Sequence, residues 1–308
     1  MKIIVIFVSI FFISCNTGKK IDNIQTLDFW NMGTSLSIKY ISDKKDINLE
    51  NRIKNYISKF DIENSFYKKE SYISKLNNSY NQFIKVPKYF CKLIERSIKY
   101  SKDTKGRFDI TYKSKIFANR NSTIFTDCKN SQIKLLKKGI ILDTGGIAKG
   151  YSIDQVAKLI KNNHYKNFLI NFGGDTLICG EKNGKNWSVG VKDPYSKKYL
   201  KIISKDILRP YLLDNDGCYS VATSGDYERY IVKNNKKLSH IIDPKTRKSI
   251  EGAHSITVIA KNATIADTLA TAISVGYKDL EYIKRMKKKY NLEIFLLTGK
   301  NLKIKEIR

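Results

Sequence analysis

The sequence is poor in cysteine, and its 5 cysteines are widely spaced. None of them forms a CxxC pair, the arrangement that zinc sites and thiol redox motifs commonly use. The sequence therefore argues against both classes of site. Four of the cysteines are available to form one or two disulfides, which would suit an exported protein. These four are Cys91, Cys128, Cys179 and Cys218.

Long apolar runs and linker-like segments are also lacking. Beyond the first residues, no stretch is long and apolar enough to predict a transmembrane helix. The chain has only 4 prolines in 308 residues, no linker rich in proline, glycine and serine, and no visible repeat. These absences favour one compact domain over residues 26–308.

Acidic residues are few, since 29 Asp and Glu stand against 57 Lys and Arg, and the formal net charge is +28. A nucleic-acid binder would show a clustered basic stripe or a reading motif. Here the lysines are spread along the chain, and only residues 285–289 are dense in them. We therefore expect no nucleic-acid partner, and a solvated basic surface that favours anionic lipids and phosphate ligands.

The first residues have the pattern of an export signal. Lys2 supplies a positive charge, and residues 3–13 form an apolar core that suits a signal peptide over residues 1–14. Ser14 before Cys15 resembles a bacterial lipobox, in which Cys15 becomes the lipidated first residue of the mature protein. Residues 15–25 would then be a polar tether to a membrane, facing the periplasm or the cell exterior. The alternative is an ordinary signal peptide followed by a stray cysteine.

The most informative segment is residues 143–154, which read DTGGIAKGYSID. Apolar residues 140–142 before it predict a strand end, and helical apolar spacing follows it. A glycine-rich turn that leads into a helix presents unpaired backbone N–H groups, which suit phosphate oxygens. Lys149 adds a positive charge, and Asp143 adds a carboxylate for a sugar hydroxyl or a metal. The alternative is a tight turn with a surface lysine, because short glycine motifs match by chance.

Hydrophobic periodicity predicts interspersed helices and strands, which indicates an α+β fold with mixed β-sheets and packed helices in one domain. Residues 140–142, the helix after the glycine turn and the strand after that helix would form a βαβ-like unit. The predicted helices cover residues 47–64, 86–101, 151–163, 264–275 and 279–290. The predicted strands cover residues 27–41 (a pair broken at 31–34), 167–172, 187–191, 219–223, 226–232, 238–242, 254–260 and 292–297.

Polar residues gather at the ends of several predicted elements. Asp175 follows two glycines at a strand end, and His240 precedes a turn. Asp267 and Thr271 are four residues apart on a predicted helix and so share one face. A carboxylate and a hydroxyl are hard oxygen ligands suited to Mg²⁺. Each residue also has a purely structural interpretation. Asp175 would cap a helix, Asp267 would be an acidic residue favoured by the dipole at a helix N-terminus, and His240 would be an ordinary strand residue.

Taken in order, these motifs resemble the ApbE-type FAD:protein FMN transferases, a flavin transferase family that includes many periplasmic lipoproteins. The resemblance extends from about residue 30 to residue 275. The matching stretches include MGT at 32–34, SYISKLN at 71–77, GRFD at 106–109, GGIAKG at 145–150, NFGGD at 171–175, ATSGDYER at 222–229, HIIDP at 240–244 and ADTLAT at 266–271.

The resemblance implies a reaction in which FMN passes from FAD to a threonine or serine hydroxyl of an acceptor protein, with release of AMP. It implies Mg²⁺ bound by Asp267, Thr271 and the backbone carbonyl of Gly146. Asp143 and Lys149 would contact FAD, Thr223 and Ser224 would contact phosphate, and His240 would be the general base. The residues that would line the flavin and adenine pocket are Met32, Tyr67, Phe108, Asp109, Ile110 and Ile241.

The sequence also departs from the family pattern. Residues 110–116 lack the proline and the Gly-Pro-Leu run that the family usually has, and Ala270 stands where some members have a second carboxylate. That second difference suggests one metal ion, or a water in its place. Two other functions stay open: an FAD pyrophosphatase that gives FMN and AMP, and a non-catalytic FAD-binding lipoprotein. By family analogy, the acceptor would be a subunit of a membrane redox complex.

Overall fold

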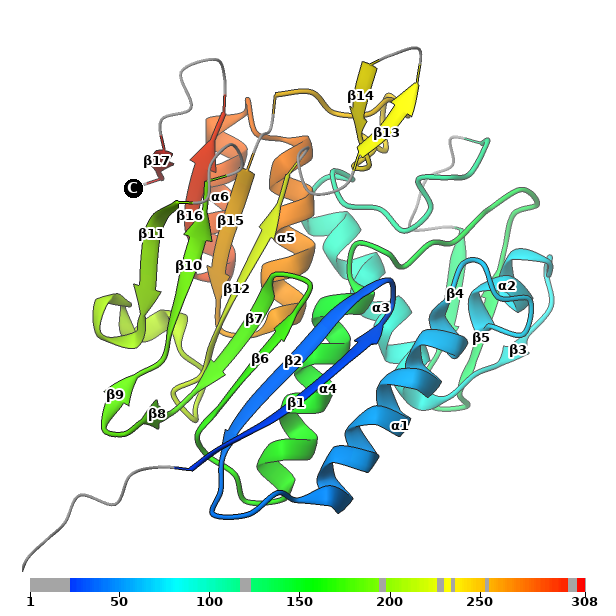
Figure 1. The fold of residues 1–308 in the computed structure, drawn as a ribbon. Helices are drawn as coiled ribbons and strands as arrows, with labels where there is room; N and C mark the ends of the chain where they lie inside the picture. Colours follow the sequence, from blue (N-terminus) through cyan, green and yellow to red (C-terminus); the bar gives the residue numbers. More distant parts are fainter. Residues whose placement is uncertain are drawn as a thin grey trace, which may run out of the picture.

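An eight-stranded antiparallel sheet runs through the molecule, with helices against one face (Figure 1). The computed structural model describes residues 23–116, 123–193, 198–225, 230–233, 236–252, 255–298 and 304–307. The strand order in the sheet is β1-β2-β6-β7-β12-β15-β16-β17. These strands are β1 (Ile24–Asn31), β2 (Thr34–Ile41), β6 (Phe168–Phe172), β7 (Asp175–Cys179), β12 (Tyr219–Ser224), β15 (Ser255–Ala260), β16 (Glu293–Leu297) and β17 (Ile304–Glu306).

Smaller sheets and six α-helices complete the described fold. The minor strands are β3 (Ile84–Lys85), β4 (Ile124–Asp127), β5 (Gln132–Leu135), β8 (Glu181–Lys182), β9 (Lys185–Asn186), β10 (Ser188–Lys192), β11 (Tyr199–Ser204), β13 (Tyr230–Lys233) and β14 (Lys236–Ser239). The α-helices are α1 (Ile47–Asn64), α2 (Tyr72–Asn77), α3 (Lys88–Asp103), α4 (Ala148–Asn162), α5 (Ala263–Val275) and α6 (Leu280–Tyr290). Two 3₁₀ turns cover Lys205–Ile207 and Pro210–Leu212.

The central strands β7, β15 and β16 are buried at every residue, because both faces of the sheet are covered. Along β12 and β15, alternate side chains point to opposite faces of the sheet. Val221 and Ile259 pack under the β10–β11 hairpin together with Trp187. Ala222 and Val258 instead face the core formed with α3, α5 and α6. The helices and the hairpin therefore cover the sheet from its two sides (Figure 1).

The four cysteines considered above form two disulfides. Cys91 of α3 bonds to Cys128 beside β4, and the Cα atoms are 5.5 Å apart. Cys179 at the end of β7 bonds to Cys218 just before β12, with the Cα atoms 4.3 Å apart. Each bond closes a loop in the unfolded chain and so reduces the entropy of that state.

The predicted fold class is confirmed, and most predicted elements lie within a few residues of their expected places. The predicted βαβ-like unit is wrong. Residues 140–142 are not a strand, and β6 pairs antiparallel with both β2 and β7. The reason is the turn after β6: Gly173 and Gly174 both have positive φ (58° and 95°), which gives a two-residue hairpin back into β7.

Three boundaries also differ from prediction. Helix α4 begins at Ala148 rather than at residue 151, so Lys149 lies in its first turn. Strand β14 ends at Ser239, so His240 lies at a bend and not on a strand. Strand β1 begins at Ile24, paired with Ile41, which is two residues before the predicted start of the domain at residue 26.

Some predictions fall outside the described residues. They include the signal peptide at 1–14, Cys15 with most of the tether, and residues 226–229 of the ATSGDYER motif. Within the part of the chain that the structure describes, no helix combines the length and hydropathy needed to cross a bilayer.

Candidate active site

A cavity of about 670 Å³ opens at the end of the sheet where the β1–β2 and β6–β7 turns lie. This volume is typical of sites for drug-sized ligands and cofactors. Its wall is built from the β1–β2 turn, residues 61–68 at the end of α1, the loop at 107–112, residues 143–149, the end of β12, residues 240–244 and helix α5. Most of the motifs found in the sequence therefore meet around one cavity.

The glycine-rich segment forms a turn that ends in the first turn of α4. Asp143 holds this turn, since its Oδ1 accepts a hydrogen bond from the Gly145 N–H (2.8 Å). Its Oδ2 accepts from the Tyr112 hydroxyl (2.9 Å) and pairs with Lys113 Nζ (2.8 Å). Ile147, at the N-cap of α4, provides no side-chain cap. The expected unpaired N–H groups are not found at Ile147 and Ala148, which both donate to the Thr144 carbonyl (3.0 and 2.9 Å). The positive end of the helix dipole and the Lys149 ammonium still make this part of the wall suited to an anionic ligand.

The segment that leads to this turn is held by side chains instead of strand pairing. Asn77 Oδ1 accepts from the Leu142 N–H (2.7 Å), and Asn77 Nδ2 donates to the Leu142 carbonyl (3.0 Å). The Ile141 N–H donates to Ser114 Oγ (2.8 Å). The SYISKLN motif thus supports the site indirectly, because its last residue, Asn77, hydrogen-bonds the backbone N–H and carbonyl of Leu142 beside Asp143.

Helices α4 and α5 are in close contact at Gly150. A Cβ at Gly150 would lie 2.7 Å from the Cβ of Asp267, which leaves no room for a side chain. The Gly150 N–H donates to Asp267 Oδ2 (2.8 Å). At Gly146, a Cβ would lie 3.7 Å from Thr271 Oγ1. The structure therefore brings together the three predicted metal ligands, Gly146, Asp267 and Thr271.

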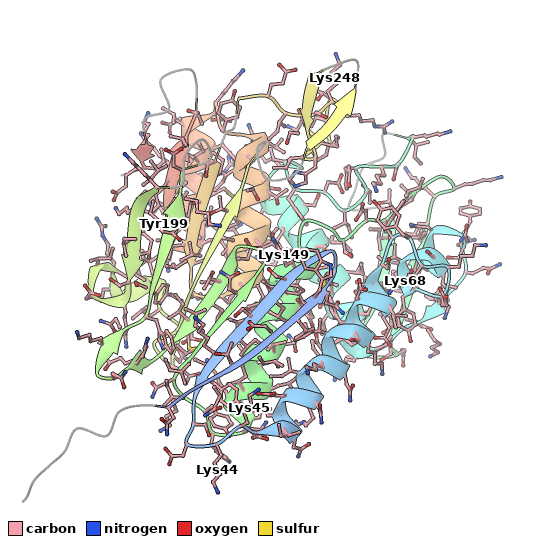
Figure 2. All side chains as sticks on the ribbon, in the orientation of Figure 1. Lys44, Lys45, Lys68, Lys149, Tyr199 and Lys248 are labelled. Carbon is pink, nitrogen blue, oxygen red and sulfur yellow. A yellow bond between two sulfur atoms is a disulfide. The ribbon has the colours of Figure 1, made fainter. Side chains whose placement is uncertain are left out.

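Asp267 is in an electrostatically unfavourable position. Only 6% of its surface is exposed. Burial, followed by the nearby Asp175 carboxylate, raises the pKa of Asp267 to about 7, against the opposing effect of Lys149 and the Gly150 N–H. Lys149 Nζ pairs with Asp175 Oδ2 at 2.9 Å (Figure 2 shows Lys149 at the centre of the molecule). The site therefore holds two buried carboxylates with one lysine between them.

This donor set fits one Mg²⁺ ion. A divalent cation would offset the free-energy cost of burying the charged Asp267 carboxylate. The Thr271 hydroxyl and a backbone carbonyl are hard oxygen donors of the type that Mg²⁺ prefers. No cluster of three or more His, Cys, Asp or Glu side chains that could hold a metal occurs among the described residues. Ala270 is fully buried in the core and does not line the cavity. The set is thus suited to a cation that keeps water or ligand oxygens in its shell.

Five of the six predicted pocket residues line the cavity, namely Met32, Tyr67, Phe108, Asp109 and Ile241. Met32 has a positive φ of 46° in the β1–β2 turn. Tyr67 is 86% exposed at the rim, whereas Phe108 is buried. Ile110 is buried and is not among the lining residues, and its carbonyl accepts the Asp143 N–H (2.7 Å). Ile110 therefore holds the glycine-rich turn and contributes no side chain to the wall.

His240 is exposed and lines the cavity beside a tight turn. This turn is closed by Asp243, whose N–H donates to the Lys248 carbonyl (2.9 Å) and whose carbonyl accepts from the Arg247 N–H (2.7 Å). The Ile250 N–H donates to the Ile241 carbonyl (3.0 Å). The HIIDP motif therefore places the imidazole at an accessible part of the wall.

The end of β12 adds two hydroxyls to the wall, from Thr223 and Ser224. The Thr223 N–H donates to Asp175 Oδ1 (3.4 Å), and Ser224 Oγ lies 3.5 Å from Thr271 Oγ1. Asp175 thus connects Lys149 with β12. It is the first residue of β7, so the alternative interpretation as a helix cap is wrong.

Several lining residues were not identified from the sequence; they include Tyr112, Arg107 and, at the end of α1 and after it, Asp61, Asn64, Ser65, Phe66 and Lys68. Tyr112 holds Asp143, but the surrounding segment departs from the family pattern and carries no signal for this role. Arg107 lies within the GRFD motif, where its charge next to Phe108 was an available signal. Its guanidinium pairs with Asp279 Oδ2 (2.6 Å) and stacks over the Tyr282 ring (4.0 Å), which anchors this loop to α6.

A protein-family model, described as the ApbE family, matches residues 32–296. The chain belongs to the ApbE family. This confirms the resemblance seen in the motifs. The FAD:protein FMN transferase of Haemophilus influenzae is 27% identical over 304 residues, which cover 86% of this chain and 84% of that protein. That of Escherichia coli K12 is 25% identical over 334 residues, which cover 96% and 92%. The chain is therefore an enzyme of the flavin transferase class.

Solved structures agree with this assignment. The crystal structure of the ApbE protein of Thermotoga maritima matches with a TM-score of 0.79 at 27% identity, over 92% of this chain and 97% of that chain. The flavin transferase ApbE of Vibrio cholerae matches with a TM-score of 0.73 over 92% and 96%, and at 22% identity it supports the fold alone. This chain therefore has the ApbE fold over nearly its whole length.

Proposed function

We propose that this ApbE-family enzyme is a Mg²⁺-dependent FAD:protein FMN transferase. It moves FMN from FAD to a threonine or serine hydroxyl of an acceptor protein, forms a phosphoester bond and releases AMP. One observation carries the proposal: the Lys149 ammonium in the first turn of α4 and the Asp267–Thr271 face of α5 meet in one cavity. An anion site next to a cation site is the arrangement that a pyrophosphate with Mg²⁺ requires.

The protein's part in this reaction is positioning and charge neutralisation. The Lys149 ammonium, at the positive end of the α4 dipole, would hold the phosphates of FAD. Asp267, Thr271 and the Gly146 carbonyl would hold Mg²⁺, which supplies positive charge to the pyrophosphate when bound. Phe108, Met32 and Ile241 offer apolar walls for the flavin and adenine rings, and Tyr67 and Asp109 complete the pocket.

The transfer step exchanges one phosphorus–oxygen bond for another. The acceptor hydroxyl oxygen attacks the phosphorus of the FMN half, and the bond between that phosphorus and the bridging oxygen breaks. AMP leaves with the bridging oxygen. His240 would take the proton of the attacking hydroxyl, since histidine accepts protons near neutral pH. The exposure of His240 at the cavity wall supports this role, because a protein acceptor must reach it from outside.

We further propose that the enzyme works outside the cytoplasm on a membrane. The export signal at 1–14 and the lipobox-like Cys15 support this placement. The acceptor would then be a membrane protein, such as a redox-complex subunit, with its hydroxyl on the same side of the membrane.

The test uses the chain with FAD, Mg²⁺ and a peptide or domain that bears a candidate threonine. Mass spectrometry follows an FMN adduct on the threonine, and chromatography follows AMP. An adduct formed together with AMP, and lost on chelation of the metal, is the expected result. AMP and free FMN without an adduct, for every acceptor tried, would identify a pyrophosphatase instead. Bound but uncleaved FAD would identify a carrier.

A further inference from the structure

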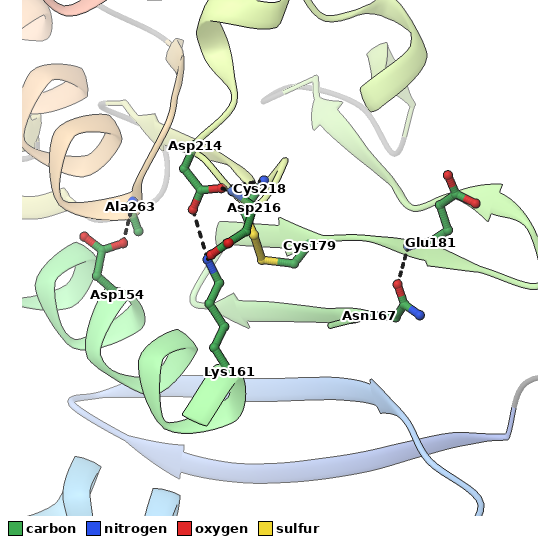
Figure 3. Close-up of a disulfide and its surroundings, with 9 residues drawn as sticks. All are labelled: Asp154, Lys161, Asn167, Cys179, Glu181, Asp214, Asp216, Cys218 and Ala263. Carbon is green, nitrogen blue, oxygen red and sulfur yellow. Dashed lines mark hydrogen bonds and ion pairs between the residues drawn. A yellow bond between two sulfur atoms is a disulfide. The ribbon is translucent and has the colours of Figure 1, made fainter. Parts of the chain in front are cut away.

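Asp154 lies one helical turn after Gly150 in α4 and contacts the first turn of α5. Its Oδ1 accepts from the Ala263 N–H (2.8 Å) and its Oδ2 from the Thr264 N–H (3.0 Å). The Thr264 hydroxyl also donates to Oδ2. Figure 3 shows the Asp154–Ala263 contact beside the start of α5. A single carboxylate thus satisfies two of the N–H groups that a helix start leaves unpaired.

The contact between the helices is reciprocal. Asp267 of α5 accepts from the Gly150 N–H in the first turn of α4 (2.8 Å), while Asp154 of α4 accepts from the first turn of α5. Each helix therefore caps the start of the other. Gly150 and Asp154 are four residues apart and lie on the same face of α4. The missing side chain at Gly150 lets the helices come close enough for both caps to form.

This pair of caps fixes both the rotation and the axial position of α5 relative to α4. Thr271 lies one turn after Asp267 on the cavity side of α5, and Gly146 lies just before α4. A slide of α5 would separate Thr271 and Asp267 from Gly146. Asp154 itself does not line the cavity. It therefore touches neither substrate nor cation, and any effect on the cation site must pass through α5.

We infer that Asp154 is a positioning residue for the cation site. It holds the start of α5 so that Asp267 and Thr271 face Gly146 at the spacing that one divalent ion requires. The inference rests on the proposed function, because it takes Asp267 and Thr271 as cation ligands. A displacement of about 1 Å at such a site lowers catalysis strongly. We therefore expect the loss of this cap to weaken cation binding in a variant that still folds.

The test compares Asp154→Asn with Asp46→Asn in the full chain. Asp46 is a matched control, because it caps α1 through the Leu49 N–H (2.9 Å) and also accepts from the Tyr165 hydroxyl (3.1 Å). Neither residue lines the cavity. In both variants an amide NH₂ group replaces one acceptor oxygen and faces the donors that the carboxylate served. Thermal unfolding of each variant measures the stability that each cap contributes.

Cation affinity is measured directly by calorimetric titration with Mn²⁺ in the absence of FAD. We expect Mn²⁺ binding to weaken about tenfold or more in Asp154→Asn and to change less than about twofold in Asp46→Asn. The Mg²⁺ concentration for half-maximal AMP release should rise by a similar factor in Asp154→Asn, and saturating Mg²⁺ should restore most of the rate. Equal Mn²⁺ affinity in Asp154→Asn and the wild type would overturn the inference and leave Asp154 a stabilising cap.

A milder variant covers the case in which Asp154→Asn does not fold. Thr264→Val removes the hydroxyl contact with Asp154 and leaves both backbone contacts, so a two- to threefold weaker Mn²⁺ affinity is expected. An unchanged affinity in a folded Thr264→Val variant would count against the inference. A wild-type protein that binds Mn²⁺ but shows no FMN transfer would contradict the proposed function alone, and the comparison of Asp154→Asn with Asp46→Asn would still decide the role of Asp154.

Discussion

The two ends of helix α4 each carry two carboxylates and one lysine, but in different surroundings. At its start, Asp267 and Asp175 lie buried near a single lysine, Lys149, and burial raises the pKa of Asp267. At its other end, Lys161 lies between two carboxylates, 3.0 Å from Asp214 Oδ2 and 2.6 Å from Asp216 Oδ2. There the lysine lowers the pKa of Asp216. Figure 3 shows this second end next to the Cys179–Cys218 disulfide.

The difference separates a binding site from a structural anchor. At the far end water reaches the carboxylates, since the side chains of Asp214 and Asp216 are 30% and 64% exposed. Asp214 also accepts from the Asp216 N–H (2.9 Å) and the Cys218 N–H (2.8 Å). At the cavity end the carboxylates are less well compensated, so the folded protein without ligands keeps an unfavourable charge arrangement. Ligands of the right charge would relieve it. Changes at the cavity end should therefore reduce activity, and changes at the far end should reduce stability.

The largest effect is expected for Asp267→Ala. Loss of the only predicted carboxylate ligand should lower Mg²⁺-dependent FAD cleavage by about a thousandfold or more, by analogy with loss of a key electrostatic group. The fold should survive, because the change also removes a buried charge. Initial rates across Mg²⁺ concentrations and a circular dichroism spectrum measure the two effects. Full activity of this variant at limiting Mg²⁺ would remove Asp267 from the cation site.

A somewhat smaller loss of rate is expected for His240→Ala. FAD affinity should stay within about threefold, while the transfer rate at saturating FAD falls by about a hundredfold to ten-thousandfold, the usual range for a general base. Fluorescence titration of FAD and single-turnover transfer separate binding from chemistry. His164→Ala is a suitable control, because His164 is exposed and does not line the cavity. Normal turnover in His240→Ala would exclude His240 as the base.

The two ends should also respond to pH in opposite directions. Asp267 has a folded pKa of about 7, above its ordinary value of 3.8, so without a divalent cation its contribution to stability is lost as the pH rises from about 4 to 7. At about 1.4 kcal/mol per pKa unit, the loss is at most about 4 kcal/mol. Asp216 has a lowered pKa, so its contribution is present above 3.8 and is lost in acid.

Urea unfolding in the presence of a chelator, from pH 4 to pH 8, measures this contrast. Asp267→Asn should flatten the decline in stability between pH 4 and 7, and saturating Mg²⁺ should flatten it in the wild type. Asp216→Asn should leave that decline unchanged. The prediction fails if Asp267→Asn and the wild type show the same pH profile without a cation.

The smallest effect on activity is expected at the far end. Replacing Cys179 and Cys218 together by alanine should lower the free energy of unfolding by about 2–4 kcal/mol, the usual contribution of a disulfide. The rate per folded molecule should change less than about twofold, since neither residue lines the cavity. Denaturant unfolding and kcat at low temperature measure the two effects. A large loss of kcat in a folded variant would show that the two ends of α4 are coupled.

Local sequence signals predicted much of this arrangement. Helix α1 has its predicted bounds, and α5 begins within one residue of its prediction, because apolar periodicity marks both helices. In the structure the side chains of Asp46 and Asn262 cap their starts. The motifs also identified most cavity residues. They did not place Ile110, whose role is carried by its backbone carbonyl. Residues 140–142 look like a strand because they are apolar, yet Asn77 and Ser114 supply their hydrogen bonds.

The sequence by itself determined the family, the fold class, the candidate cation ligands and the basic character of the surface, since these depend on residue type and short spacing. Only the tertiary structure decided the antiparallel pairing of β6 with β2, the pairing of the cysteines and the reciprocal capping of α4 and α5. Those features depend on contacts between residues far apart in the chain, such as Asp154 and Thr264 or Gly150 and Asp267. Their energies arise from burial and hydrogen-bond geometry, which no local pattern specifies.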